Sequence, residues 1–160
     1  MILNKDIDIE DDIRKALSGF NLTAYCRPLP KDYALPHVLI TQVGGTVSQT
    51  IDTIEVVLDT RAETEAEALD YLNLAKAILE QVAKSQTTEI RHVVVNSSGS
   101  WGVDPVRPDL AMCSARLAIT AHQEKIYIDH PAYLTDEKSN RIMDENEDEL
   151  VGIMSYIKRR

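Results

Sequence analysis

Apolar residues at helical spacing mark the first element of the chain. Ile9, Ile13 and Leu17 stand four residues apart and form one narrow apolar stripe. Acidic residues gather near the start of this stretch, where the helix dipole favours negative charge. The pattern predicts a surface helix over residues 6–18 that covers one side of the domain, with Gly19 in the position of a C-terminal cap.

A second and longer stretch has the same periodicity. Thr64 and Glu67 match the Thr-x-x-Glu capping box with which helices often begin. Apolar residues then recur at helical spacing as far as Val82. This stretch predicts a helix that begins at residue 64 and ends near residue 85.

The remaining apolar stretches favour strands. Apolar and polar residues alternate most clearly around Ile54, Val56 and Leu58, which share one face of the predicted strand. We expect that face to be buried and the opposite face to be partly exposed to solvent. With the strand before it, this stretch is expected to form a long hairpin. The predicted strands cover residues 22–27, 36–43, 46–60, 87–96 and 111–121, and residues 97–109 are predicted to form a loop.

The order of these elements predicts the fold class. Runs of strands interrupted by one long helix favour an α+β domain. We expect a mainly antiparallel sheet of about five strands with two helices packed on one face, plus a C-terminal extension. The predicted domain covers residues 1–122, and residues 123–160 form the extension.

The extension differs in composition from the domain. Residues 124–129 favour a further strand or an arm, and residues 135–149 are strongly acidic, as in a solvated linker. Apolar residues at helical spacing return in residues 150–157. Two interpretations stay open for this end: a short amphipathic helix that docks on a partner, or a frayed C-terminus.

Composition and charge exclude several classes of protein. The chain of 160 residues carries 17 Lys and Arg against 26 Asp and Glu, which gives a net charge of −9. Such a charge argues against a protein that grips nucleic acid, because phosphate binding needs clustered cations. No apolar run approaches the roughly 20 residues of a membrane span, and the N-terminus lacks the apolar core of a signal peptide.

The residues that most often act in catalysis or metal binding form no recognisable motif in this sequence. The four histidines lack metal-ligand spacing, and no phosphate-binding or nucleophile motif is present. Cys26 and Cys113 are interpreted as buried thiols of a reducing cytosol, although either one could in principle pair with a histidine as a nucleophile. We therefore expect no enzyme activity, no catalytic residues, no metal and no cofactor.

Three stretches of the chain carry a resemblance to a known family. They are LPHVLITQVGG at residues 35–45, IEVVLDTRAETEA at residues 54–66, and SGSWGVDP at residues 98–105, which precedes a last strand containing Arg116. In these stretches and in the order of elements over residues 6–122, the chain resembles the small tail terminator (tail completion) proteins of long-tailed bacteriophages and prophages. Residues after Gln123 lie outside the resemblance.

The resemblance implies a structural protein of the virion, assembled in the host cytoplasm. Its subunits would form a homo-oligomeric ring, expected to be a hexamer, that caps the tail tube and stops its polymerisation. The ring would also join the head connector (stopper) protein, and DNA would pass through its lumen without specific binding. An acidic ring would suit that role, since it would repel the phosphate backbone.

Residues in elements expected to be exposed are the candidates for the assembly interface. The candidates are Gly44, Gly45 and Thr46 at the expected hairpin bend, Arg61 at the strand–helix junction, and Trp101, Asp104 and Arg107 in the predicted loop. Four of these residues also have a plainer interpretation. Gly44 and Gly45 would serve a turn or a bulge, Arg61 a surface salt bridge, and Trp101 an anchor that packs the loop.

Two other functions stay open at this point. One is a head–tail connector (adaptor) ring, which would share the virion but bind the portal side. The other is a small enzymatic or ligand-binding α+β domain with a pocket near Cys113 and His92.

Overall fold

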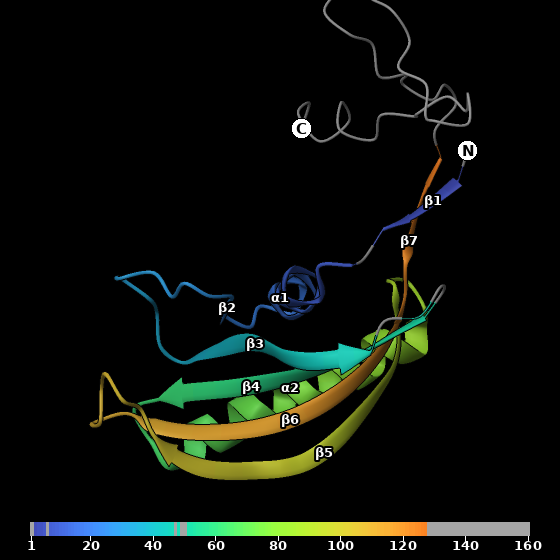
Figure 1. Cartoon of the computed structure of the whole chain (residues 1–160). Coiled ribbons are helices and arrows are strands. Elements are labelled where there is room, and N and C mark those ends of the chain that lie inside the picture. Colours follow the sequence, from blue (N-terminus) through green and yellow to red (C-terminus); the bar gives the residue numbers. More distant parts are fainter. Residues whose placement is uncertain (1, 6, 47, 49–50, 128–160) are drawn as a thin grey trace, which may run out of the picture. The chain divides into compact units, whose positions relative to one another are not determined.

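The computed structural model describes residues 2–5, 7–46, 48 and 51–127, and it divides the chain into two compact units (Figure 1). One unit, Asp6–Glu124, holds both described helices and a five-stranded sheet; the other includes Met1–Lys5 and the chain from Lys125 onward. The elements are β1 (Ile2–Lys5), α1 (Ile9–Gly19), β2 (Ala24–Tyr25), β3 (His37–Thr46), β4 (Ile51–Ala62), α2 (Glu65–Ser85), β5 (Ile90–Val103), β6 (Ala111–His122) and β7 (Glu124–Tyr127).

The larger sheet has the strand order β2-β3-β4-β6-β5, and Figure 1 shows its four long strands side by side. The pairs β3–β4, β4–β6 and β5–β6 are antiparallel, as the hairpin pattern predicts. The short strand β2, however, runs parallel to β3. The sheet is therefore mixed, and the prediction of a mainly antiparallel sheet is corrected at this edge. The α+β class itself agrees with the structure.

Helix α2 begins where the sequence predicts it, whereas α1 begins at Ile9, three residues later than the predicted start at residue 6. The Asp8 carboxylate accepts from the backbone N–H of Asp11 and caps α1, and the Thr64 hydroxyl accepts from the N–H of Glu67 and caps α2. Helix α1 ends one residue later than predicted, because Phe20, rather than Gly19, is its cap.

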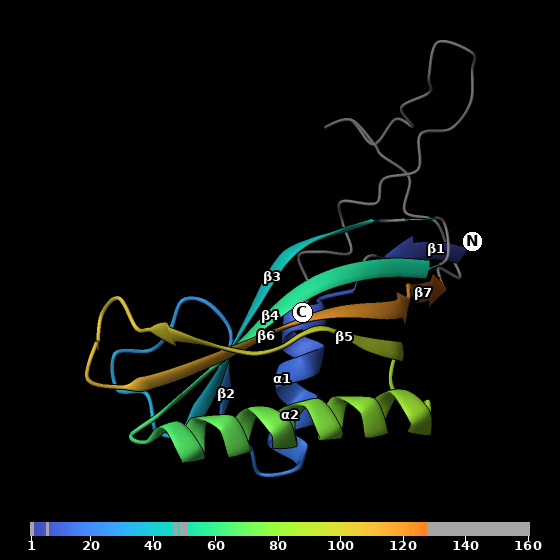
Figure 2. The ribbon, with the colours of Figure 1, turned by 90° about the horizontal axis from the view of Figure 1, so that it is seen from below.

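One hydrophobic core joins the two helices to a single face of the sheet. Ile9, Ile13 and Leu17 of α1 are fully buried, and they share a cluster with the buried face of α2. In β4 the side chains that alternate toward this cluster are buried, whereas those that alternate away are exposed or half-buried as far as Asp59. Figure 2 shows α2 lying along the sheet. We call the sheet face opposite the helices the open face.

Strand β5 extends seven residues further than the sequence predicts. Residues 97–103 were predicted to be loop, but they continue β5 and pair with β6. The pairing register shifts between Val95 and Ser97 and again between Ser97 and Ser100, and Gly99 has a φ of 51°. These bulges let Gly and Ser residues stay in a strand that their local preference would end.

The two-stranded sheet consists of β1 and β7. Strand β1 was not predicted, while β7 agrees with the further strand expected at residues 124–129. The predicted acidic linker and amphipathic helix of residues 135–157 lie outside the described residues.

Candidate functional site

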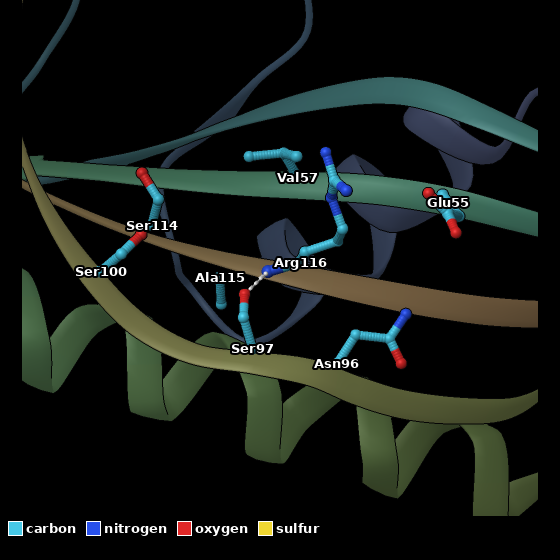
Figure 3. Close-up of a pocket in the computed structure, with 8 residues that line it drawn as sticks. All are labelled: Glu55, Val57, Asn96, Ser97, Ser100, Ser114, Ala115 and Arg116. Atoms are coloured by element: carbon cyan, nitrogen blue, oxygen red, sulfur yellow. Dashed lines mark hydrogen bonds between the residues drawn. The ribbon is translucent and has the colours of Figure 1, made fainter.

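The open face carries a groove of about 530 Å³ between β4, β6 and β5 (Figure 3). Its lining is mostly polar and small. The lining residues are Glu55, Val57, Asn96, Ser97, Ser100, Ser114, Ala115 and Arg116. Two of the three register shifts in the β5–β6 pairing lie beside this groove, and bulges are frequent where a strand has to redirect side chains at a functional site.

Arg116 is the principal charged group of the groove. Its backbone N–H donates to the Ser97 hydroxyl at 3.0 Å, which ties β6 to the bulged strand (Figure 3). Its side chain is exposed, and within the described residues it forms no ion pair. The two carboxylates nearest along β4 are Glu55 and Asp59, and Asp59 instead accepts from the Ser114 hydroxyl. Arg116 is thus a cation with unused hydrogen-bonding capacity.

Where β4 ends and the β5–β6 loop begins, the open face holds a buried ion pair. The guanidinium of Arg61 at the end of β4 forms an ion pair with the Asp104 carboxylate, and the two side chains are only 10% and 4% exposed. The other Asp104 oxygen accepts from the backbone N–H groups of Val106 and Arg107 at 2.7 and 2.9 Å. Asp104 therefore fastens the β5–β6 loop to the end of β4.

The surroundings of Asp104 determine its ionisation. Burial alone raises the pKa of this carboxyl, but the two backbone N–H donors and the Arg61 charge outweigh burial and hold the pKa below its ordinary value. Asp104 is thus a carboxylate at neutral pH, as its pairing with Arg61 requires.

His37 lies directly opposite Arg61 in the β3–β4 register and is completely buried. Its Nδ1 is 2.8 Å from the Ala34 carbonyl oxygen, and its ring makes edge contacts with Tyr25 and Tyr33. Burial lowers the pKa of His37, and the Arg61 charge adds to this effect. A neutral His37 therefore donates from Nδ1, and this end of the open face is a packed structural cluster.

The first group of predicted interface residues is not at a hairpin bend. Gly44, Gly45 and Thr46 all belong to β3, where they pair with Glu55, Ile54 and Thr53 of β4. The bulge interpretation is the correct one for the glycines, because the register shifts between Gln42 and Gly44.

Arg61 and Asp104 were predicted to be exposed, and both predictions were wrong. Tertiary packing buries the two side chains as a pair. The salt bridge proposed for Arg61 exists, but in the interior and with a partner 43 positions away in sequence, which local pattern cannot reveal.

Trp101 and Arg107 are exposed, as predicted. Trp101 is 51% exposed and sits in β5 opposite Cys113 rather than in a loop. Arg107 forms a two-contact ion pair with Asp109 on the surface, which raises the pKa of Arg107. Val103 and Val106 nearby are 69% and 81% exposed, so this end of the molecule presents apolar side chains to solvent.

The structure does not bring Cys113 and His92 together. Cys113 is buried in the core, where burial raises the pKa of its thiol. His92 pairs with Thr120, seven residues further along β6, or about 23 Å at the usual strand rise. No pocket can therefore join these two residues. Among the described residues, no group of His, Cys, Asp or Glu could hold a metal ion.

Sequence reasoning missed the groove residues. Ser97 and Ser100 were assigned to a loop, so their position beside β6 was not expected. A signal was available in β6, where Ser114 and Arg116 alternate with the buried Cys113 and Ala115 and therefore share the face away from the core.

Neither described helix has the length and apolar character of a membrane span. Comparison with known proteins found no family model that matches this chain and no curated protein with significant similarity to it.

Proposed function

We propose that this protein is a tail terminator of a long-tailed bacteriophage or prophage. Copies of the chain form a hexameric ring that caps the tail tube, ends its polymerisation and joins the tail to the head connector. DNA passes through the lumen without specific binding. The protein belongs to the virion, at the head–tail interface, and assembles in the host cytoplasm.

The observation that carries this proposal is the uncovered open face. In the described part of the chain, no helix packs on the open face, and Val94 on this face remains 43% exposed. A sheet with an uncovered, partly apolar face favours a protein that completes its packing against other subunits. The net charge of −9 supports a lumen through which DNA slides without sticking.

The groove gives the ligand-binding alternative a specific observation in its favour. Its volume falls within the range of small-molecule sites. Such sites are, however, mainly apolar with a few convergent polar groups, whereas serines, Asn96, Glu55 and Arg116 dominate this lining. A polar groove on a sheet face fits a contact between proteins better.

The test of the proposed function is an electron micrograph of particles that lack this protein. We expect over-long tails and separate heads, because nothing would stop growth of the tube. Tails of normal length beside separate heads would instead identify a connector. A purified chain that stays monomeric and binds a small metabolite would contradict both virion roles.

The exposed position of Trp101 gives a second prediction. Trp101→Ala is expected to weaken assembly while changing the free energy of unfolding by only about 1 kcal/mol, because half of the side chain is already in water. Light scattering after size exclusion would measure assembly, and urea unfolding would measure stability. Unfolding of the isolated subunit by this substitution would show instead that Trp101 anchors the fold.

A further inference from the structure

The outer side of α2 has an unusual composition for a surface helix. Ala66, Asp70, Asn73, Leu74 and Ala77 follow one another at helical spacing, and all five are exposed. They lie opposite the buried side of the helix. Over these three turns the strip carries one charge, the Asp70 carboxylate, and Leu74 is 48% exposed. We call these five residues the α2 strip.

The centre of the open face has a matching composition. Val57 lies opposite Arg116 in the β4–β6 register, and Val94 lies opposite Ala118 in the β5–β6 register. These apolar residues share the face of the sheet on which Arg116 lies. Arg116 is the exposed arginine that lines the groove of the open face.

We infer that the α2 strip of one copy of this chain docks on the open face of the next copy, with Asp70 paired to Arg116. Neither of these two charges has an ion-pair partner within the described part of its own chain. A guanidinium and a carboxylate can form two parallel hydrogen bonds. Leu74, one turn from Asp70, then reaches the apolar surface of Val57, Val94 and Ala118.

The two surfaces lie on opposite sides of the same subunit, because α2 packs on the sheet face that the groove does not occupy. A contact between different surfaces is heterologous, and it repeats from copy to copy until the rotation closes a ring. The inference rests on the proposed function, since it supplies the subunit contact that the ring requires. It also gives the hydroxyls of Ser97 and Ser100 a role, which is to meet polar side chains such as Asn73.

Charge exchange between the two positions tests the inference. Sedimentation velocity of the full chain would compare wild type with Asp70→Arg, Arg116→Asp and the double variant. Each single variant is expected to raise the dissociation constant of the assembly at least tenfold, because it places like charges together. The double variant is expected to restore assembly. Lys31→Asp, which makes the same charge change as Arg116→Asp at an exposed position outside both surfaces, is the control and should assemble normally.

Circular dichroism would verify that every variant is folded; the exposed positions of Asp70 and Arg116 make this the expected result. Single variants that assemble like wild type would overturn the inference and leave the proposed ring standing. Failure of the double variant to assemble would also overturn it. A wild-type chain that stays monomeric would overturn the contact between copies, and the micrograph of particles lacking the protein would then decide the proposed function separately.

Discussion

Replacing Asp104 by Ala is expected to lower the free energy of unfolding by about 3–5 kcal/mol. The substitution would leave the Arg61 guanidinium buried without its carboxylate, and it would remove the acceptor of two backbone N–H groups in the β5–β6 loop. Removing one partner of a buried ion pair costs more than the pair itself contributes, because the remaining charge cannot recover its hydration. Urea unfolding at pH 7 would measure the change.

Asp109→Ala is the matched control for this prediction. Asp109 also pairs with an arginine, Arg107, but on the surface, so its loss is expected to leave the urea midpoint almost unchanged. Equal effects at the two aspartates would contradict the assignment of Asp104 to the interior.

The lowered pKa of Asp104 predicts that the stability of the fold depends on pH. Since the pKa of Asp104 is lowered in the folded protein, its contribution to stability is complete above the ordinary aspartate pKa of about 3.9. The contribution is lost as the pH falls through the lower, folded pKa. The stability difference between wild type and Asp104→Asn should therefore be constant near neutral pH and should narrow below pH 4. A difference that widens in acid would contradict this.

Gly45→Ala is expected to cost about 2–4 kcal/mol of unfolding free energy. Gly45 has a φ of 149°, a region that residues with a Cβ rarely adopt. A Cβ at this position would lie 2.6 Å from the Thr53 carbonyl oxygen and 2.9 Å from the Ile54 Cα, both of which are backbone atoms of the paired strand. Backbone in a ladder cannot move aside without breaking its hydrogen bonds, so the hairpin should be strained. Thermal unfolding would measure the cost.

The neighbouring glycine provides the control. Gly44 has no atom within 4 Å of an added Cβ, so Gly44→Ala should leave stability within about 1 kcal/mol of wild type or raise it slightly. If both substitutions cost the same, the special backbone of Gly45 would not be the cause.

Secondary structure was predictable where a local pattern coincides with its tertiary role. The cap at Thr64 and the buried stripe of α1 follow from side chains within a few residues of one another. The predicted strand ended at residue 96, too early, because the Ser and Gly residues at 97–102 favour turns locally. In the fold, pairing with β6 along its whole length outweighs that preference.

The candidate site was much less predictable than the fold. The groove assembles residues from β4, β5 and β6, and its position depends on a β5–β6 register that shifts at the bulges of β5. Likewise, Arg61 meets its partner Asp104 only because of the path that the β5–β6 loop takes. Neither feature has a signature in adjacent residues.

The sequence by itself determined the α+β class, the presence of the two helices with the start of α2, the alternation of β4 and β6, and the acidic charge. These properties depend on periodicity and composition, which act over short distances along the chain. Only the tertiary structure decided that β2 runs parallel, that Arg61 and Asp104 are buried together, and that Arg116 lies uncovered on the open face. Burial and pairing depend on which distant segments meet, so packing decides which polar residues are structural and which remain available to a partner.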